Sequence, residues 1–359
     1  MRKNYIDNIR ILCILLLFPF HTCMIFNNWG ELFYITSKPY SLPSNFVSLV
    51  YPWWMNLMFT IAGISTYYAL QKRTTKEYAK ERFQKLFLPL LVGIVVIIPV
   101  QSYIANVYHH NYAGGYFRHY QVFFSKFTNL TGQDGGFTPG HLWFMLYLYI
   151  ISMVMLINMK GFLIKKSQYD GSKVKIVHLV PMFLLILLCT PILELGGKSI
   201  GESFICFVLG FFLLSYEKVQ ETLERNYKLL LLLFLSAILG RLIMQFYDVE
   251  GLLFDIEQRV LSWFGILAIL GFGKRFLNHS NSLTTYFSKA AFSLYYFHQS
   301  ILVVLGFFVL KQVDNVRIQF LLIMVGSFIL SLLFYEIFRR NKVTSILFGI
   351  KYKSPRINN

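Results

Sequence analysis

The chain has 359 residues, of which 56% are hydrophobic and 14% are charged, and its formal net charge is +17. A soluble domain is about a quarter charged, so this composition excludes a water-soluble protein and requires lipid as solvent. The positive charge does not indicate nucleic-acid binding, because Lys and Arg stand in short segments beside apolar runs. None of the four cysteines belongs to a CxxC pair, and we expect neither a disulfide framework nor a metal site.

Apolar runs recur along the whole chain. A membrane helix needs about 20 largely apolar residues, and ten runs meet or approach that length. They predict an all-α fold, a polytopic transmembrane helix bundle with about ten spans. The predicted spans are 9–28, 51–70, 86–105, 141–159, 176–194, 199–216, 228–246, 258–273, 289–310 and 318–338.

The basic residues indicate the orientation. With the N-terminus in the cytoplasm and alternating spans, most of the 34 Lys and Arg residues fall on the cytoplasmic side, as the positive-inside rule requires. Both termini are then cytoplasmic, and we expect a multi-pass plasma-membrane protein. Residues 1–345 form one predicted transmembrane domain, and 346–359 form a basic cytoplasmic tail.

Two predicted outer loops, 29–50 and 106–140, are long, polar and aromatic. A long loop on a helix bundle usually has a function or is disordered. The second loop carries His109, His110 and His119. These histidines are too scattered along the loop to predict a metal site.

Ionisable residues inside a membrane span are costly and are candidates for function. Arg10 and His21 lie in the first predicted span, and their spacing places them on one helical face, separated by roughly 16 Å of rise. Asp7 is within side-chain reach of Arg10, and Pro19 is expected to kink the helix. The alternatives are that Arg10 anchors the span at the interface and that His21 is a structural contact in the bundle.

A basic segment between the second and third predicted spans ends in Arg82 and Lys85. Three residues apart on a helix, these two would share a face. One interpretation is a clamp for the phosphates of a nucleotide-bearing donor such as coenzyme A. The other is that the charge only sets the topology.

Several later residues are weaker candidates. His141 and Trp143 open the fourth predicted span, where Trp143 also fits an interfacial aromatic belt. His298 lies within the ninth span, and Arg241 lies in the seventh, one turn from Gln245. Each of them is either an acceptor-side residue or a polar contact between helices.

Five segments, in order along nearly the whole chain, carry a family resemblance. On these segments the chain resembles the acyltransferase 3 family of multipass membrane acyltransferases, and most of all its glucans biosynthesis protein C branch. The most specific element is the Arg and His of the first helix, separated by ten residues. The segments are Tyr5-Ile6-Asp7-Asn8-Ile9-Arg10 with His21, Trp54 to Gly63, Arg82-Phe83-Gln84-Lys85-Leu86 with Pro89, Gly140-His141-Leu142-Trp143-Phe144, and Tyr296-Phe297-His298-Gln299.

Two positions depart from the family pattern. Ala62 stands where the second-helix segment usually has Ser before Gly, which puts any role of that hydroxyl in doubt. Lys85 stands in place of the second Arg of the basic element. Lys keeps the charge but lacks the planar fork that grips phosphate with two hydrogen bonds.

The resemblance implies an enzyme that uses acyl-CoA as donor, carries no permanent cofactor, and acylates a hydroxyl of a glycan or another envelope acceptor. The acyl group is commonly acetyl, or succinyl in the glucan branch. His21 is our candidate base or covalent acyl carrier, because imidazole titrates near neutrality. Asp7 is expected to orient Arg10, and Arg10, Arg82 and Lys85 to hold the coenzyme phosphates.

Two other classes of protein remain possible. A transporter or flippase of similar size would also bury polar groups along a path through the membrane. A membrane sensor or scaffold is a further alternative, although the chain has no soluble output domain. Thioester turnover distinguishes the enzyme from both. The sequence leaves the acyl group, the acceptor and the oligomeric state open.

Overall fold

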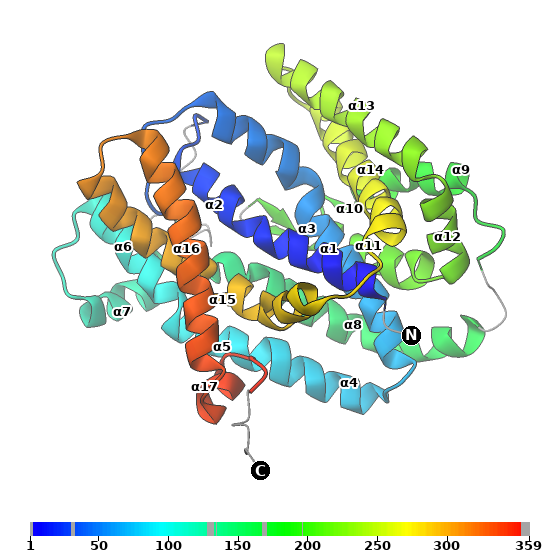
Figure 1. Ribbon diagram of the computed structural model, residues 1–359, viewed down its shortest axis with the longest axis horizontal. Coiled ribbons are helices and arrows are strands. Elements are labelled where there is room, and N and C mark those ends of the chain that lie inside the picture. Colours follow the sequence, from blue (N-terminus) through cyan, green and yellow to red (C-terminus); the bar gives the residue numbers. More distant parts are fainter. Residues whose placement is uncertain are drawn as a thin grey trace. The chain divides into compact units, whose positions relative to one another are not determined.

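The computed structural model describes residues 3–29, 33–127, 133, 135–166, 171–195 and 197–352. The described chain is built of helices, with one short antiparallel hairpin of strands β1 and β2 (Figure 1). The elements are α1 (Asn4–Leu15), α2 (Leu17–Ile25), α3 (Ser41–Leu70), α4 (Thr75–Arg82), η1 (Phe83–Phe87), α5 (Leu88–Val96), α6 (Ile98–His110), α7 (Tyr116–Ser125), η2 (Gly140–Leu142), α8 (Trp143–Lys166), α9 (Ile176–Leu179), η3 (Val180–Met182), α10 (Phe183–Cys189), β1 (Glu194–Leu195), β2 (Lys198–Ser199), α11 (Ile200–Leu209), η4 (Gly210–Leu214), α12 (Glu217–Arg225), α13 (Tyr227–Phe246), α14 (Leu252–Phe276), α15 (Ser282–Gln312), α16 (Val316–Phe338) and α17 (Lys342–Leu347).

The all-α polytopic fold predicted from the sequence is confirmed. Within the described residues, six helices are long and apolar enough to cross a membrane, or seven if a bent pair counts as one span. The six are Asn4–Ile25, Ser41–Leu70, Thr75–His110, Tyr227–Phe246, Ser282–Gln312 and Val316–Phe338. The count of ten spans and the cytoplasmic termini stay predictions, and tail residues 353–359 lie outside the described part.

The two predicted outer loops contain more helix than expected. Helix α3 begins at Ser41, ten residues before the predicted span, and Pro43 lies in its first turn. Proline is tolerated there, where its missing N–H is not needed. The loop 106–140 begins inside α6 and contains the amphipathic helix α7.

The chain divides into two compact units. Unit 1 consists of residues 1–13, 48–81 and 147–284, and unit 2 consists of residues 14–47, 82–146 and 285–359. Each unit is therefore assembled from segments far apart in the sequence.

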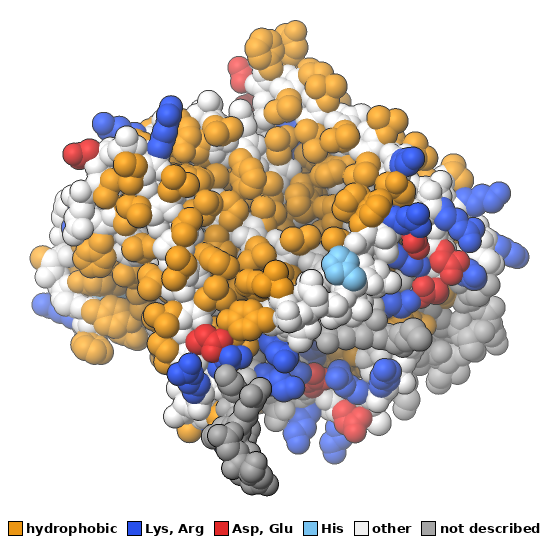
Figure 2. All heavy atoms as spheres, viewed as in Figure 1, with side chains coloured by type: hydrophobic (Ala, Val, Ile, Leu, Met, Phe, Trp, Pro, Cys, Tyr) orange, Lys and Arg blue, Asp and Glu red, His pale blue; other side chains and the backbone are white. Residues whose placement is uncertain are grey.

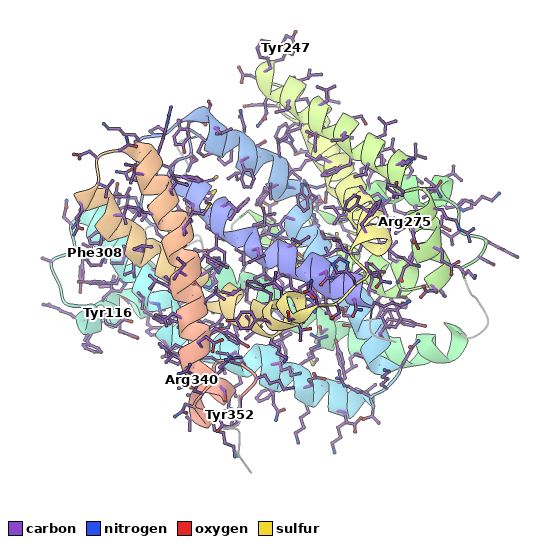
Figure 3. All side chains as sticks on the ribbon, viewed as in Figure 1. Tyr116, Tyr247, Arg275, Phe308, Arg340 and Tyr352 are labelled. Atoms are coloured by element: carbon purple, nitrogen blue, oxygen red, sulfur yellow. The ribbon has the colours of Figure 1, made fainter. Side chains whose placement is uncertain are left out.

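In unit 1, α13 and α14 pack closely against one another (Figure 1). Tyr247 marks one end of the pair and Arg275 the other (Figure 3). The turn at the Tyr247 end is acidic, with Asp248 and Glu250, whereas the last turn of α14 is basic. The two ends of the pair therefore differ in charge, and the orientation in which the turn lies outside stays a prediction.

Gly63 in α3 allows a second close contact in unit 1. A Cβ atom built at this glycine would collide with the backbone carbonyl of Phe207 in α11, and one at Gly210 would collide with the carbonyl of Thr60. The two helices approach backbone to backbone, as small residues permit in membrane bundles. This packing explains why Gly63 is needed in the segment where Ala62 replaces Ser.

In unit 2, α16 packs against α2, and its outward surface is apolar. Figure 2 shows hydrophobic side chains over the visible face of α16 and Lys or Arg side chains gathered near its lower end. Arg340 lies at that end in Figure 3. An exposed apolar helix surface that ends in basic residues is typical of a lipid-facing span.

Candidate active site

The helix that carries His21 is interrupted just before it. Helix α1 ends at Leu15, and α2 begins at Leu17. Pro19 has no N–H to donate to the carbonyl of Leu15, so the regular helical bonding breaks at this point. The helix is thus interrupted at Leu16, within the candidate span Asn4–Ile25, and the kink expected from Pro19 stays a prediction.

Three histidines of unit 2 lie side by side. The ring of His298 in α15 is 5.0 Å, centroid to centroid, from the ring of His21 and 5.0 Å from that of His141. His298 is fully buried, His141 is 5% exposed, and His21 is half-buried. Residues separated by more than 270 positions thus form one cluster, which we call the histidine cluster (His21, His141 and His298).

Backbone carbonyls determine which ring nitrogens carry a proton. Nδ1 of His298 lies 2.7 Å from the carbonyl oxygen of Tyr295, and Nε2 of His141 lies 2.9 Å from that of Tyr296. Because a carbonyl only accepts, these nitrogens donate, and the other nitrogen of each neutral ring is a lone-pair acceptor. Nε2 of His298 has no hydrogen-bond partner among the described residues. The cluster therefore contains a buried basic nitrogen that is open to a proton.

Two consecutive tyrosines of α15 hold this arrangement. The hydroxyl of Tyr295 donates to the carbonyl of His141 at 2.7 Å, and that of Tyr296 donates to the carbonyl of Pro89 at 2.8 Å. Both side chains are buried, so each hydroxyl needs such a partner. They tie α15 to η2 and α5 and fix the position of the helix turn that bears His298.

In unit 1, Arg10 is held by two partners. Its Nη1 donates to Oδ1 of Asp7 at 3.0 Å, and its Nη2 donates to the hydroxyl of Ser65 in α3, also at 3.0 Å. The predicted pairing of Asp7 with Arg10 is present. The Arg10 side chain is 34% exposed, so the guanidinium is oriented without being sealed. Such a group is suited to bind an anion.

Arg82 immediately precedes an irregular turn, and Lys85 lies within it. Residues Phe83–Phe87 form a π-helix, whose hydrogen bonds run from residue i to i+5. The wider turn removes the α-helical register on which their shared face was predicted. Lys85 is exposed and Arg82 is half-buried. Isolated π-turns are frequent at functional sites, so the segment stays a candidate.

Arg241 and Trp143 each contact other charged or aromatic side chains. Arg241 is 2% exposed, forms an ion pair of 2.9 Å with Glu257 of α14, and stacks on Phe254. These contacts favour the structural alternative for Arg241, as a link between α13 and α14. Trp143 follows η2 and packs edge-on against Phe144.

A second polar network in unit 1 was not anticipated. Asn56 of α3 donates to Glu202 of α11 at 2.6 Å and to Ser262 of α14 at 2.9 Å. Arg259 pairs with Glu202 at 3.4 Å and donates to Thr190 at 2.9 Å. The network joins four helices in the apolar interior, where hydrogen bonds between helices stabilise packing.

Sequence reasoning missed Ser65 and Glu202. Glu202 is the one charged residue in the apolar run 199–216, and that was the available signal, whereas Ser65 lies beside Thr66 and does not stand out. Their partners Arg10 and Arg259 lie on other helices, and periodicity along one helix does not identify a partner on another.

Comparisons with known proteins identify the family of this chain. The family described as "Acyltransferase domain", acyltransferase 3, matches residues 3–336. The chain belongs to this acyltransferase family. It is therefore an acyltransferase of the membrane, as the ordered motifs predicted.

Similar proteins span the same length. The chain is 23% identical to glucans biosynthesis protein C of Escherichia coli O6:K15:H31 (strain 536 / UPEC), over 99% of this chain and 97% of that protein. It is 22% identical to the proteins of that name from Shigella dysenteriae serotype 1 (strain Sd197) and Escherichia coli (strain K12), with the same coverage. No solved structure matches the chain.

Proposed function

We propose that this chain is a plasma-membrane O-acyltransferase that moves an acetyl or succinyl group from acyl-CoA to a hydroxyl of a glycan or another cell-envelope acceptor. Membership of the acyltransferase family supports the reaction class. The name of the similar glucans biosynthesis proteins favours a glycan as acceptor. The observation that carries the mechanism is the histidine cluster, with its open basic nitrogen in a buried environment.

His21 is the proposed base. It removes the proton from the acceptor hydroxyl while the oxygen attacks the thioester carbonyl, the carbon–sulfur bond breaks, and the coenzyme thiolate leaves. The proton then returns from the imidazolium to the thiolate, which balances the reaction. In the covalent variant, a His21 nitrogen attacks the thioester carbonyl, the carbon–sulfur bond breaks and the coenzyme thiolate leaves. The acceptor oxygen then takes the acyl group from the imidazole, and its proton goes to the thiolate.

His298 is proposed to assist His21. Its Nδ1 proton is committed to the Tyr295 carbonyl, so its Nε2 offers a lone pair to the neighbouring ring. A proton taken up by His21 is stabilised by such an acceptor nearby, as the orienting partner of a base does in other acyl-transfer enzymes. His141, whose Nε2 is likewise committed to a carbonyl, holds the other side of the His298 ring.

The donor is proposed to be held by positive charge. Arg10 stands on the same candidate span as His21, Asn4–Ile25, and is oriented by Asp7 and Ser65. A guanidinium fixed in this way can donate two parallel hydrogen bonds to a phosphate of coenzyme A. Arg82 and Lys85 of unit 2 are proposed for the coenzyme phosphates on the basic sequence motif alone.

The test is the release of free coenzyme A by the purified protein in detergent, with acetyl-CoA and succinyl-CoA compared. His21→Ala is expected to abolish release and His110→Ala, at an exposed histidine, to preserve it. Circular dichroism and thermal unfolding confirm that both variants are folded. Near-normal acylation by His21→Ala would overturn the role of His21. Wild-type protein that neither turns over nor binds either thioester would favour a transporter.

A further inference from the structure

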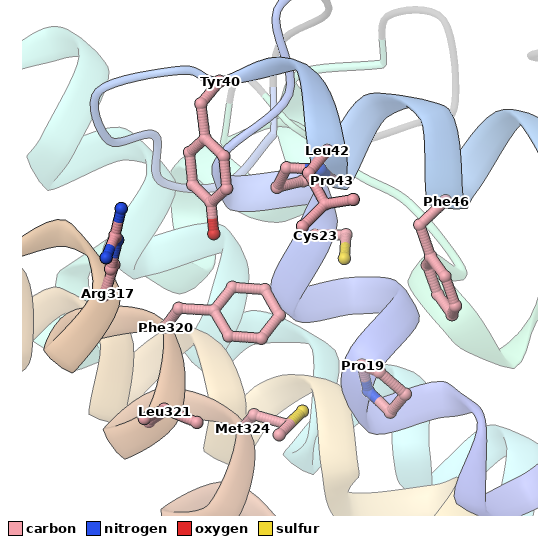
Figure 4. A pocket seen from close by; sticks show the side chains of 10 residues that line it. All are labelled: Pro19, Cys23, Tyr40, Leu42, Pro43, Phe46, Arg317, Phe320, Leu321 and Met324. Atoms are coloured by element: carbon pink, nitrogen blue, oxygen red, sulfur yellow. The ribbon is translucent and has the colours of Figure 1, made fainter.

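Unit 2 contains an apolar pocket of about 460 Å³ between α2, the start of α3 and α16 (Figure 4). This volume falls in the range of ligand sites, roughly 300–1,000 Å³. The histidine cluster is not part of its wall. The lining residues are Pro19, Cys23, Tyr40, Leu42, Pro43, Phe46, Arg317, Phe320, Leu321 and Met324.

The pocket lies along α16, a candidate membrane span whose outward surface is apolar. Arg317 is the second residue of α16, and Met324 lies seven residues further, roughly 10 Å deeper into the span. Leu42 and Leu321, two of the wall residues, are 72% and 55% exposed, so the pocket is open toward the side where lipid tails lie. An apolar recess at this depth is filled more favourably by hydrocarbon than by water.

Only the outer rim is polar. The guanidinium of Arg317 stands at the rim, and the hydroxyl of Tyr40 points into the pocket beside it (Figure 4). In the described part of the chain the Arg317 guanidinium has no ion pair, and Arg at a span end reaches toward the headgroup layer. Guanidinium binds phosphate with paired hydrogen bonds, and Tyr favours the same interface.

We propose that this pocket binds an anionic phospholipid, with one acyl chain along Phe320 and Met324 and the phosphate on Arg317. Apolar depth and cationic rim together match the two parts of that molecule. A polar soluble ligand would leave the apolar wall unused, and an uncharged lipid would leave Arg317 unused.

The site lies against the helix that carries the proposed base. Pro19 and Cys23 are four residues apart, so they share the face of α2 that forms the pocket wall. His21 lies midway between them, on the opposite face, where it meets His298. Bound lipid therefore packs against the face of α2 opposite His21 and stabilises the position of this helix. This effect is independent of whether His21 acts as a base.

The experiment is native mass spectrometry of the detergent-purified protein titrated with phosphatidylglycerol or phosphatidylcholine. Wild type is expected to retain phosphatidylglycerol. Arg317→Gln should weaken that retention about fivefold, since one basic residue contributes about this much near an anionic headgroup. Met324→Trp, which fills the pocket, should weaken the retention of both lipids. Lys311→Gln, which removes a nearby cation outside the pocket, should bind like wild type.

Three results would overturn the proposal. The first is equal retention of phosphatidylglycerol by wild type, Arg317→Gln and Met324→Trp. The second is equal retention of phosphatidylcholine and phosphatidylglycerol by wild type, which would indicate bulk lipid. The third is displacement by inorganic phosphate at matched concentration, which would show that the apolar pocket contributes nothing. Thermal unfolding establishes that each variant is folded.

Discussion

Two histidines of unit 2 are equally buried and use their ring nitrogens differently. His119 in α7 and His298 in α15 are both 0% exposed. His119 has a partner at each nitrogen: Nδ1 faces the side-chain amide of Asn106 at 3.4 Å, and Nε2 faces the hydroxyl of Ser102 at 3.1 Å. Among the described residues, His298 has a partner at Nδ1 only. The two side chains are equally buried, but only His119 has a hydrogen-bond partner at both ring nitrogens.

Both ring nitrogens of His119 are hydrogen-bonded, one as a donor and the other as an acceptor. The Ser102 hydroxyl donates to the carbonyl of Gly135 at 2.8 Å, so it accepts from Nε2–H of His119, and Asn106 donates to Nδ1. Gly135 has a φ of +88°, and a Cβ there would press against Asn106, so only glycine fits this turn. His119 is thus a structural residue of the 106–140 segment, and an open buried nitrogen is the better sign of chemistry.

Within the comparison of His119 with His298, the largest expected effect comes from removing the open Nε2 of His298. His298→Asn should lower kcat about 100-fold or more, because general acid–base groups typically contribute about 10²- to 10⁴-fold. The same substitution at the matched position, His119→Asn, should leave kcat within a few-fold of wild type. Release of coenzyme A from saturating acyl-CoA measures both. Equal losses in the two variants would mean that the open nitrogen of His298 has no chemical role.

Two arginines of unit 1, Arg10 and Arg241, extend the comparison to cations. The Arg241 side chain is buried against Glu257 and Phe254, whereas the Arg10 side chain is hydrogen-bonded but about a third exposed. Glu257→Gln leaves a buried guanidinium without its counter-charge, which costs about 3–5 kcal/mol of unfolding free energy. We expect a lower Tm in detergent with an unchanged KM for acyl-CoA. A raised KM with normal Tm would place Arg241 at the donor site.

Arg10 should show the opposite pattern. Arg10→Lys keeps the charge but loses the planar fork that Asp7 and Ser65 orient, so KM for acyl-CoA should rise about tenfold with little change in Tm. Ser65→Ala removes one hydrogen bond to the same group and should raise KM by a smaller factor. An unchanged KM in both variants would return Arg10 to the role of an interface anchor.

These contrasts also show where sequence reasoning stops. The spans predicted at 228–246 and 318–338 nearly coincide with α13 and α16. A long run of apolar residues predicts a membrane helix without any knowledge of the helices that pack against it. The helix interruption at Leu16 likewise lies beside a local feature of the sequence, Pro19, which has no N–H to donate. Each unit, however, is built from distant segments, and the sequence contains no record of which helices become neighbours.

In the candidate site, contacts within one helix were predictable from the sequence, whereas contacts between helices were not. Asp7 and Arg10 are one helical turn apart, so their contact was predictable, whereas Ser65 was not. His21, His141 and His298 were each singled out by their place in an apolar run, but their meeting depends on three separate helices. The π-turn at Phe83–Phe87 has no sequence signature of its own, and the regular face expected for Arg82 and Lys85 failed there.

The smallest effect is expected at His119, and only in acid. Burial lowers the pKa of His119 to about 4, from an ordinary value near 6.5. The unfolded chain therefore binds this proton more readily than the folded one, so the stabilisation is complete above pH 6.5 and is lost as the pH falls toward 4. His119→Gln, which offers an amide to Ser102 and Asn106 without titrating, should lose less Tm than wild type between pH 7 and pH 4.5. The two proteins should differ least in this slope above pH 6.5, and parallel Tm curves across the whole range would contradict a neutral, fully bonded His119.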